Sequence, residues 1–493
     1  MNEINDLVKD RLRKLDALRA AGWDVFGRRF DKTPIGQLVE GYEENKSVRT
    51  AGRLTAMRVM GKSTFADLRD ETGRIQVYLK KDELEPALKE LVDNLDLGDI
   101  VGVSGELFKT RTGEISVRAR QITPLAKSVR PMPEKWHGLK DVELRHRHRY
   151  LDLMANEETR EIFRKRSRII RSVRRTLDEE GYLEVETPMM HPIPGGAAGK
   201  PFKTHHEALD MPLFLRVAPE LYLKRLLVGG YDRVYEINKS FRNEGISTRH
   251  NPEFTMLEVY TAYHDVEDVM ALTERIVRRA AEETLGTLVI ESEGRRLDLS
   301  RWERVSFAKL MKERLGILPD DETAAWVDKL KKRGIDLGGN KEISRTQVIN
   351  IVADLLDSEL KTEGDTVRPV FVTDYFTELC PLAKKKKDEP LISERFELYV
   401  GGMEVANGYS ELNDPLEQRE RLMAELADKG RQATADTLDE DFIYALEHGM
   451  PPAGGLGIGI DRLVMVLTGQ ASIREVILFP QLKNERVRSR AEA

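Results

Sequence analysis

The spacing of apolar residues changes character along the chain. Over residues 2–21 apolar side chains recur at helical spacing and Gly22 ends the stretch, which predicts an amphipathic helix. From Val48 to Leu125 the spacing shortens to the two-residue period of β-strands. The predicted strands cover residues 48–60, 63–70, 74–80, 99–108 and 114–123, with a helix at 82–95. Five short strands with one helix between the third and the fourth are typical of an OB-fold, a small barrel that often binds oligonucleotides; another small barrel is the alternative.

A proline-bearing segment separates this region from the rest of the chain. Residues 129–139 are predicted to form a linker, and both periodicities are mixed after about residue 143. The predicted helices there cover residues 157–180, 265–285, 415–429 and 462–468, and the predicted strands cover 232–242, 253–263, 394–400 and 403–411. We therefore expect an α+β protein with two domains, residues 1–142 and residues 143–493.

Alternation within the barrel strands also predicts which side chains point outward. Ile75 and Val77 share the inner face of the third strand, so Gln76 between them faces away from the core. The same alternation in neighbouring strands places Phe65 and Glu114 on the outside. A ring that stacks on a base, beside an amide and a carboxylate that read base edges, suits recognition of single-stranded nucleic acid. Three ordinary surface residues are the alternative.

The composition is that of a globular protein. Of the 493 residues, 40% are hydrophobic and 33% are charged. No apolar stretch approaches the roughly 20 residues that cross a bilayer, and the N-terminal residues hold no apolar signal segment. We therefore expect a cytoplasmic protein without membrane contact. The single cysteine, Cys380, excludes internal disulfides, so any metal would be bound by carboxylates or histidines.

Charge is unevenly distributed along the chain. The 79 basic and 85 acidic residues give a net charge of −6, but between Lys127 and Arg175 basic residues outnumber acidic ones about two to one. Such a stretch either follows a phosphate backbone or belongs to solvated helices whose arginines serve the structure. On charge alone the second interpretation is favoured. The run from Lys384 to Lys387 is likewise predicted to be a solvated loop.

Three alternating glycines lie near the C-terminus. Gly455, Gly457 and Gly459 lead into Asp461 and Arg462, where a helix is predicted to begin. The spacing matches neither the dinucleotide-binding fingerprint nor a phosphate-binding P-loop. A strand without side chains on one face lets a flat base or ribose approach the backbone. The segment is therefore a candidate nucleotide surface, with tight packing as the alternative.

A second candidate nucleotide segment begins at the end of the predicted strand 232–242. Arg242 takes the polar face of that strand, and the loop that follows carries Arg249 and His250. The chain then returns as a strand that bears Phe254. An arginine for a phosphoryl group, two loop cations for outer phosphates and a ring that stacks on a base are the parts of an ATP site.

A third segment, residues 181–188, follows a long amphipathic helix and consists of a short strand that ends at a proline. In chain order, the three segments resemble motifs 1, 2 and 3 of the class II aminoacyl-tRNA synthetases. An OB-fold ahead of that catalytic domain resembles subclass IIb, which handles lysine, aspartate and asparagine. The strings that are similar to bacterial lysyl-tRNA synthetases are PGGAA (194–198), APELYLKR (218–225), RHNPEFT (249–255), NGYSELND (407–414) and ALEHGMP (445–451). The resemblance covers nearly the whole chain and implies a catalytic domain built on an antiparallel β-sheet flanked by helices.

This resemblance implies an enzyme that activates L-lysine with ATP and Mg2+ and transfers it to tRNA(Lys). It also implies a homodimer, joined through the helix and strand that end at Pro188. The implied ATP-binding residues are Arg242, Glu244, Arg249, His250, Phe254, Glu397, Glu404 and Arg462, with Arg242 and Arg462 catalytic and Glu397 and Glu404 as metal ligands. The implied anticodon-binding residues are Phe65, Gln76 and Glu114.

The lysine site implied by the resemblance agrees with an argument from charge. Its residues are Glu258, Tyr260 and Glu411 for the ε-ammonium, Glu220 and the Gly196 backbone for the α-amino group, and Arg242 and Asn407 for the α-carboxylate. Burying an ammonium without carboxylate partners is prohibitively costly, whereas an aspartate pocket needs cations. An aspartyl- or asparaginyl-tRNA synthetase is therefore disfavoured. A non-catalytic RNA-binding paralogue is disfavoured because the implied catalytic set is complete.

The strands predicted around residues 401–402 offer a geometric test. If these two glycines form a two-residue turn, residue 399 pairs with 404 and 397 with 406, so Glu397 and Glu404 share one face. Diagonal neighbours lie about 7 to 8 Å apart, and two glutamates there can share Mg2+ with phosphate oxygens. Strict alternation would turn Asn407 away from that face. We therefore expect a bulge near Gly408.

Overall fold

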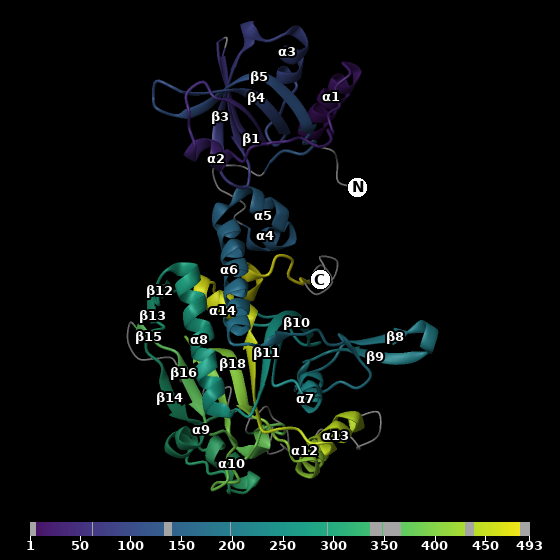
Figure 1. Cartoon of the computed structure of the whole chain (residues 1–493), viewed down its shortest axis with the longest axis vertical. Helices are drawn as coiled ribbons and strands as arrows, with labels where there is room; N and C mark the ends of the chain where they lie inside the picture. Colours follow the sequence, from purple (N-terminus) through teal and green to yellow (C-terminus); the bar gives the residue numbers. More distant parts are fainter. Residues whose placement is uncertain are drawn as a thin grey trace. The chain divides into compact units, whose positions relative to one another are not determined.

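The computed structural model describes residues 6–61, 63–132, 141–197, 199–292, 294–335, 348, 366–428 and 438–483. The chain forms two compact units, Met1–Lys140 and Asp141–Ala493 (Figure 1). The predicted N-terminal helix and the predicted linker lie partly outside the described residues. No helix in the described ranges is long and apolar enough to span a bilayer.

The first unit is a closed barrel with the strand order β1-β2-β3-β5-β4. Its strands are β1 (Ser47–Met60), β2 (Ser63–Arg69), β3 (Arg74–Lys80), β4 (Ile100–Lys109) and β5 (Ile115–Ala126). Its helices are α1 (Asp6–Ala20), α2 (Ile35–Glu40) and α3 (Pro86–Asp93). Alternate residues such as Leu68, Ile75 and Val77 fill the interior and are almost completely buried. Because α3 lies between the third and fourth strands, the predicted OB-fold is confirmed.

The second unit is built on an eight-stranded sheet with the order β14-β16-β17-β18-β19-β11-β10-β6. Its strands are β6 (Leu183–Glu184), β10 (Arg233–Phe241), β11 (Glu253–Ala262), β14 (Glu303–Ser306), β16 (Val370–Thr373), β17 (Arg395–Val400), β18 (Met403–Ser410) and β19 (Ala453–Gly459). Only the outermost pairs, β14 with β16 and β6 with β10, are parallel. The predicted antiparallel sheet is therefore confirmed, with the four predicted strands at its centre.

Three helices pack against the sheet: α6 (Glu157–Glu179), α8 (Val266–Leu285) and α14 (Ile460–Thr468). Tyr235, Leu257 and Val259 from the sheet join one buried cluster with Ile169 and Val173 of α6. Because side chains alternate along a strand, the residues between them point to the opposite face. That opposite face carries the candidate site.

The remaining elements border this face or extend the second unit. The smaller sheets contain β7 (Met190–His191), β8 (Lys203–His206) and β9 (Met211–Leu215), and β12 (Val289–Ser292), β13 (Arg295–Asp298) and β15 (Thr366–Val367). The other helices are α4 (Val142–Arg147), α5 (Arg149–Ala155), α7 (Glu220–Val228), α9 (Phe307–Leu310), α10 (Thr323–Lys331), α12 (Pro415–Asp428), α13 (Glu440–Glu447) and α15 (Ile473–Val476). In Figure 1 the β8–β9 hairpin projects away from the main sheet. Helix α7 contacts β10, β11 and α13, and so borders the candidate site.

Local sequence explains where α8 begins and ends. Asp265 accepts hydrogen bonds from the first backbone N–H groups of the helix, and the Asp268 side chain accepts one from the Asp265 backbone. This reciprocal capping satisfies donors that the helix itself leaves unpaired. Gly286 ends the helix with φ +73°, a conformation that favours glycine.

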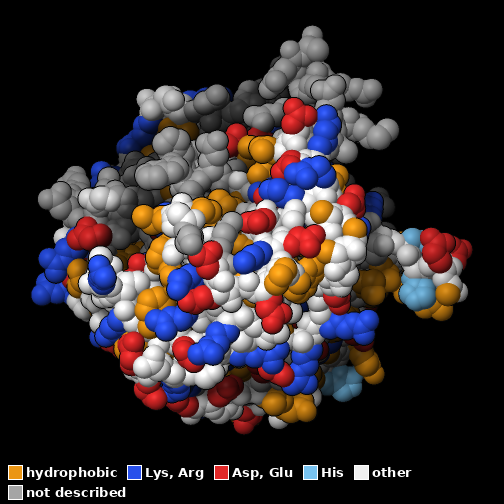
Figure 2. All heavy atoms as spheres, turned by 90° about the horizontal axis from the view of Figure 1, so that it is seen from above, with side chains coloured by type: hydrophobic (Ala, Val, Ile, Leu, Met, Phe, Trp, Pro, Cys, Tyr) orange, Lys and Arg blue, Asp and Glu red, His pale blue; other side chains and the backbone are white. Residues whose placement is uncertain are grey.

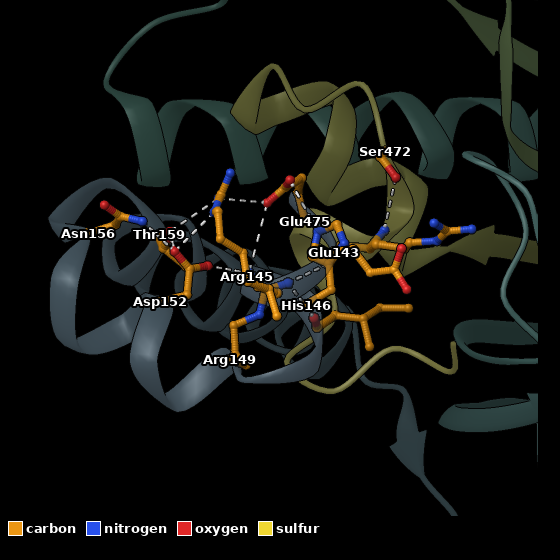
Figure 3. Close-up of polar contacts among 12 residues, drawn as sticks. Glu143, Arg145, His146, Arg149, Asp152, Asn156, Thr159, Ser472 and Glu475 are labelled. Carbon is orange, nitrogen blue, oxygen red and sulfur yellow. Dashed lines mark hydrogen bonds and ion pairs between the residues drawn. The ribbon is translucent and has the colours of Figure 1, made fainter. Parts of the chain in front are cut away.

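Most arginines of the basic stretch pair with carboxylates. Arg145 lies between Asp152 and Glu475, at 3.1 Å from each, and Arg149 pairs with Asp152 at 2.7 Å (Figure 3). The arginines of α6 that form ion pairs are Arg160, Arg164, Arg166, Arg168, Arg174 and Arg175. On the face shown in Figure 2, basic and acidic side chains are interspersed. These ion pairs agree with the interpretation that the sequence favours, in which the arginines serve the structure.

Candidate active site

One cross-strand row of the main sheet contains three of the predicted site residues, Glu397, Asn407 and Glu258. Glu397 pairs with Asn407, Asn407 with Gly457, Gly457 with Glu258, and Glu258 with Glu236. Residues that pair across strands point to the same face of a sheet. The row therefore brings residues that are far apart in sequence into one line, on the face opposite α6 and α8.

The turn at residues 401–402 forms as predicted, but the bulge lies elsewhere. Both glycines have positive φ, 62° and 74°, as a two-residue hairpin turn requires. Glu404 pairs with residue 399 as predicted, whereas Glu397 pairs with Asn407 instead of residue 406. Val405 is the extra residue, and the shift that it causes places Glu397, Glu404 and Asn407 on one face.

The predicted bulge near Gly408 is therefore wrong in position. Gly408 pairs with Phe396 in regular register. A Cβ added to Gly408 would lie 2.7 Å from the carbonyl oxygen of Gly455 and 2.8 Å from the Phe396 ring. A glycine is needed there because two neighbouring strands approach closely, not because the strand bulges.

The glycines of β19 leave room for side chains from both neighbouring strands. Gly455 pairs with Tyr260 on one side and with Tyr409 on the other. A Cβ at Gly455 would stand 1.8 Å from Oε1 of Glu411 and 2.8 Å from Cε1 of Tyr260. The sequence suggested that this face receives a flat base or ribose. At Gly455 the structure instead shows close packing against residues predicted to bind lysine.

Glu258 is a buried carboxylate without a cation beside it in the described structure. Its hydrogen bond comes from the Tyr260 hydroxyl, at 3.3 Å. Burial, reinforced by the charges of Glu220 and Glu236, raises the pKa of Glu258 well above its usual value. Glu236, its cross-strand neighbour, is instead paired with Arg216 at 2.7 Å. Of these two neighbouring carboxylates, Glu258 is the one suited to receive a cation.

A lysine of the protein itself lies beside the other two carboxylates of the pocket. Lys224, on α7, is completely buried, and its Nζ lies 2.8 Å from Oε1 of Glu220 and also contacts Oε2 of Glu411. The Tyr409 hydroxyl donates a hydrogen bond to Oε1 of Glu220 at 2.6 Å. Burial raises the pKa of Glu411 to about 8, although the Lys224 ammonium acts in the opposite direction.

Sequence reasoning assigned no role to Lys224 or Tyr409. The spacing of Glu220 and Lys224, one helical turn apart, was a signal that could have indicated the first contact. Gly196, predicted to offer its backbone to the α-amino group, has φ +85°, and its Cβ position lies 3.2 Å from the Cβ of Glu220. The structure therefore brings these predicted lysine-binding positions together.

Arg242 is a largely buried guanidinium on the same side of the sheet. It follows the last residue of β10, and its Cζ lies 5.1 Å from the centre of the Phe254 ring. Its Nε is buried and has no hydrogen-bond partner among the described residues. Burial lowers the pKa of Arg242, while the charges of Glu404 and Glu244 act in the opposite direction. A desolvated arginine of this kind is suited to bind an anion.

Arg462, in the first turn of α14, is the second predicted catalytic cation. It donates hydrogen bonds to the backbone oxygen of Glu404 at 2.8 Å and to Oε2 at 3.1 Å. Its other terminal nitrogen lies 3.2 Å from Nε2 of His250. Burial and the charge of Arg462 lower the pKa of His250, which favours the neutral imidazole. The remaining predicted ATP-binding residues on the loop between β10 and β11 are Glu244, which is exposed, and Arg249, which is half-buried.

Glu397 and Glu404 have different surroundings. Glu397 accepts hydrogen bonds from Arg395 at Oε1 and from the Tyr375 and Tyr399 hydroxyls at Oε2, all within 2.7 Å. The Glu404 side chain is 35% exposed, compared with 13% for Glu397. No group of three or more His, Cys, Asp or Glu in the described ranges could bind a metal by itself. Two carboxylates on one face nevertheless fit Mg2+, which commonly takes its other ligands from phosphate and water.

The predicted anticodon-binding residues lie on the outside of the barrel. Phe65 pairs with Tyr78, and their ring centres are 5.1 Å apart. Gln76, two residues before Tyr78, donates a hydrogen bond to Glu114 at 3.4 Å. Glu114 also accepts one from Arg74 at 2.5 Å. The structure thus places the three residues near one another, and their part in base recognition stays a prediction.

Two family profiles match the chain. One, described as class II tRNA synthetases (D, K and N), matches residues 141–483, and the other, described as an OB-fold nucleic acid binding domain, matches residues 48–125. Both agree with the fold and the site described above. The chain is a member of the class II tRNA synthetases.

Curated relatives show to which family within this class the chain belongs. The Lysine–tRNA ligase of Carboxydothermus hydrogenoformans is 51% identical over 489 residues, which cover 98% of this chain and 99% of the relative. Those of Bacillus subtilis and Staphylococcus aureus are 46% and 47% identical, with 98% of this chain and at least 98% of each relative covered. Within its class, the chain belongs to the lysine–tRNA ligase family.

Proposed function

We propose that this protein activates L-lysine with ATP and transfers the lysyl group to the 3′ end of tRNA(Lys). The observation that carries the proposal is the pair of buried carboxylates, Glu258 and Glu411, on the face that also presents Arg242, whose buried Nε has no hydrogen-bond partner among the described residues. An ammonium at one end of the substrate and a carboxylate at the other would satisfy both ends of this pocket.

In the first step the lysine carboxylate attacks the α-phosphorus of ATP, and pyrophosphate leaves. The carboxylate is already a nucleophile, so no general base is required. Arg242 and Asn407 would hold the attacking carboxylate, while Phe254 stacks on the adenine. Arg242 and Arg462 would stabilise the negative charge that develops on the phosphoryl oxygens. The neutral His250 imidazole beside Arg462 would accept or donate a hydrogen bond without adding charge.

Glu404 and Glu397 would hold Mg2+ at the edge of this site. Glu404 is the more accessible of the two, and Oε1 of Glu397 accepts one hydrogen bond, which leaves it a further lone pair. When bound, the ion would neutralise phosphate charge. The Tyr375 and Tyr399 hydroxyls would keep the Glu397 carboxylate in one orientation.

The amino-acid specificity is tested by pyrophosphate exchange with each of the twenty amino acids in turn. We expect exchange with lysine and only background exchange with the other nineteen. Exchange with aspartate or asparagine would contradict the assignment of the anionic pocket. An absence of exchange with every amino acid would favour a non-catalytic RNA-binding paralogue.

The barrel would bind the anticodon of tRNA(Lys), with Phe65, Gln76 and Glu114 as its contacts. Support comes from their common position on the outside of an OB-fold. The absence of disulfide-forming cysteine pairs in the sequence suits action in the reducing cytoplasm.

A homodimer is proposed for the second unit. Strand β6 lies at the edge of the main sheet, and nearby apolar side chains are exposed, with Leu183 at 46% and Met190 at 53%. Covering an edge strand and its apolar neighbours with a second copy would remove both from water. Sedimentation should therefore give twice the 56.3 kDa chain mass. A single 56.3 kDa species at micromolar concentration would contradict the dimer.

A further inference from the structure

Lys224 has surroundings that a purely apolar packing role does not require. Its side chain is completely buried and its ammonium contacts two carboxylates, Glu220 and Glu411, that reach it from different elements. Two aromatic rings, of Tyr409 and Phe442, lie 5.6 and 6.0 Å from Nζ. The ammonium is therefore fixed from several sides, and it ties α7 to the segment that follows β18.

The two carboxylate oxygens of Glu411 have different surroundings. Oε2 forms an ion pair with Lys224, while Oε1 lies over Gly455 beside the Tyr260 ring. Neither oxygen has a hydrogen-bond partner among the described residues, and Oε1 has no ion-pair partner there either. A buried carboxylate oxygen without a partner is costly, so it points to a cation or donor that the pocket receives from outside. One oxygen of Glu411 is therefore fixed by Lys224, and the other is available to a cation or donor that enters the pocket.

The charges around the pocket also favour the binding of a cation from outside. Two carboxylates, Glu220 and Glu411, share the single ammonium of Lys224, so negative charge is in excess within this contact even before Glu258 is counted. L-lysine carries one net positive charge at neutral pH. Bound lysine would therefore reduce this excess of negative charge. Without Lys224 the same complex would retain a buried negative charge, which is unfavourable in a site closed to water.

We propose that Lys224 is a positioning residue for the amino-acid substrate: its ammonium holds Glu220 and Glu411 in place and supplies the charge that lets both bind the substrate's ammonium groups as carboxylates. The inference rests on the proposed function, since it assumes that lysine is the substrate. Lys224 does not itself touch the reacting atoms. Its effect passes through Glu220 to the α-amino group and through Glu411 to the ε-ammonium.

The proposal predicts a specific pH effect. The charged or titratable groups that face Glu411 are Glu220 and Lys224 from α7, Tyr260 from β11 and Tyr409 from β18. Lys224 is the group among them that favours the ionised form of Glu411. Its removal should therefore raise the pH at which Glu411 becomes a carboxylate. Lysine binding, which needs that carboxylate, should recover only at higher pH.

The test compares Lys224→Met with the unaltered protein in lysine-dependent pyrophosphate exchange from about pH 6 to about pH 9. We expect kcat/KM for lysine at neutral pH to fall at least about tenfold, and the acidic limb of its pH profile to move up by about one unit or more. The KM for ATP should change little. A structural role alone would lower kcat/KM by the same factor at every pH.

A matched control is available in the barrel unit. Lys127 is also a buried lysine between two carboxylates, Asp96 at 2.6 Å and Asp99 at 2.8 Å. Lys127→Met removes a similar ion-pair group in the unit that contributes no residue to the pocket, so exchange and its pH profile should stay unchanged. If Lys224→Met does not fold, Lys224→Gln keeps hydrogen-bonding capacity without the charge and should show the same shift. Tyr409→Phe, which removes only the hydroxyl on Glu220, should raise the lysine KM several-fold.

Two outcomes would overturn the proposal. A pH profile of the folded Lys224 variant that coincides in shape with that of the unaltered protein would show that Glu411 does not depend on Lys224. A lower lysine KM in the variant would show that Lys224 occupies the place of the substrate ammonium instead of supporting its ligands. If the unaltered protein itself shows no lysine-dependent exchange, the proposed function fails, and that result is distinct from both.

Discussion

Gly455 and Glu411 cannot both keep their positions if residue 455 carries a side chain, because a Cβ there would stand 1.8 Å from Oε1 of Glu411. The glutamate therefore lies over a backbone segment that has to be glycine. Tyr260 lies beside the same point, at 2.8 Å from that Cβ position. The contact links a glycine of β19 directly to the proposed ammonium site.

Gly455→Ala should accordingly impair lysine activation. The added methyl group would displace Glu411 and Tyr260, so the lysine KM in pyrophosphate exchange should rise by about tenfold or more, which corresponds to about 1.4 kcal/mol. The KM for ATP should change much less. Gly73→Ala, in the barrel unit, is a matched control. Its Cβ would make only ordinary contacts, the nearest at 3.7 Å. An unchanged lysine KM in the folded Gly455 variant would contradict the pocket.

Substitution of Glu258 or of Glu236 by glutamine should change the thermal stability of the protein in opposite directions. Glu258→Gln removes a buried charge that has no cation beside it, so the substrate-free protein should gain thermal stability while its lysine KM rises. Glu411→Gln should also raise the lysine KM and depress adenylate formation. Glu236→Gln leaves Arg216 buried without its carboxylate and should destabilise the protein, by about 3 to 5 kcal/mol. Thermal melts measure the stability of the variants, and exchange kinetics measure their lysine KM. Equal effects of the Glu258 and Glu236 substitutions on stability would count against Glu258 as the carboxylate that receives the substrate cation.

The two proposed metal ligands can be separated by stability. Glu404→Gln should reduce exchange severely and change its Mg2+ dependence, while lysine binding measured by calorimetry survives, because the ion serves the phosphates. Glu397→Gln should lose exchange and also lower the melting temperature, since it disturbs the hydrogen bonds from Arg395, Tyr375 and Tyr399. An identical Mg2+ titration in the Glu404 variant and its parent would contradict the metal site.

Phe65→Ala should separate the two units functionally. Pyrophosphate exchange should stay unchanged because it needs only the second unit, whereas aminoacylation should weaken by about 1 to 3 kcal/mol, the usual effect of losing one base stack. The loss should appear mainly in the KM for tRNA. Phe65→Leu keeps apolar area without the aromatic face and should recover little. Full tRNA affinity in the leucine variant would refute stacking and leave Phe65 as a packing partner of Tyr78.

Acid should destabilise the second unit through the cluster in Figure 3. Burial alone would raise the pKa of Glu475, but the hydrogen bond with His146 and the charges of Arg145 and Arg149 outweigh it and lower that pKa. A carboxyl whose pKa is lowered on folding stabilises the fold above its unfolded pKa, about 4.3, and loses that contribution as the pH falls through the folded value.

Glu475→Gln should therefore unfold more easily at pH about 7 and depend less on pH below about 4. Chemical denaturation at several pH values would measure both effects. Glu440→Gln is the control, because the pKa of Glu440 is also lowered, by Arg419, but both side chains are exposed. Solvent screening should make its effect small. Equal losses in the two variants would contradict a special role for the buried cluster.

Local periodicity was sufficient to locate the barrel strands and several of the long elements of the second unit. The five barrel strands and the central strands β10, β11, β17 and β18 lie within a few residues of their predicted positions. Such prediction succeeds because alternation and helical spacing reflect which side of one element is buried, and that information is contained in neighbouring residues. The turn at residues 401–402 was predictable for the same reason, since two adjacent glycines allow positive φ.

Contacts between distant segments required the fold. The bulge is at Val405 and not near Gly408, because the position of a register shift depends on how β17 and β19 pair with β18 from either side. Gly408 is explained by its distance to the Phe396 ring, which no local pattern contains. The partners of Lys224 are likewise a matter of tertiary structure: its helical neighbour Glu220 is visible in the sequence, but Glu411 reaches it only after the sheet and α7 have packed together, when burial makes their opposite charges depend on each other.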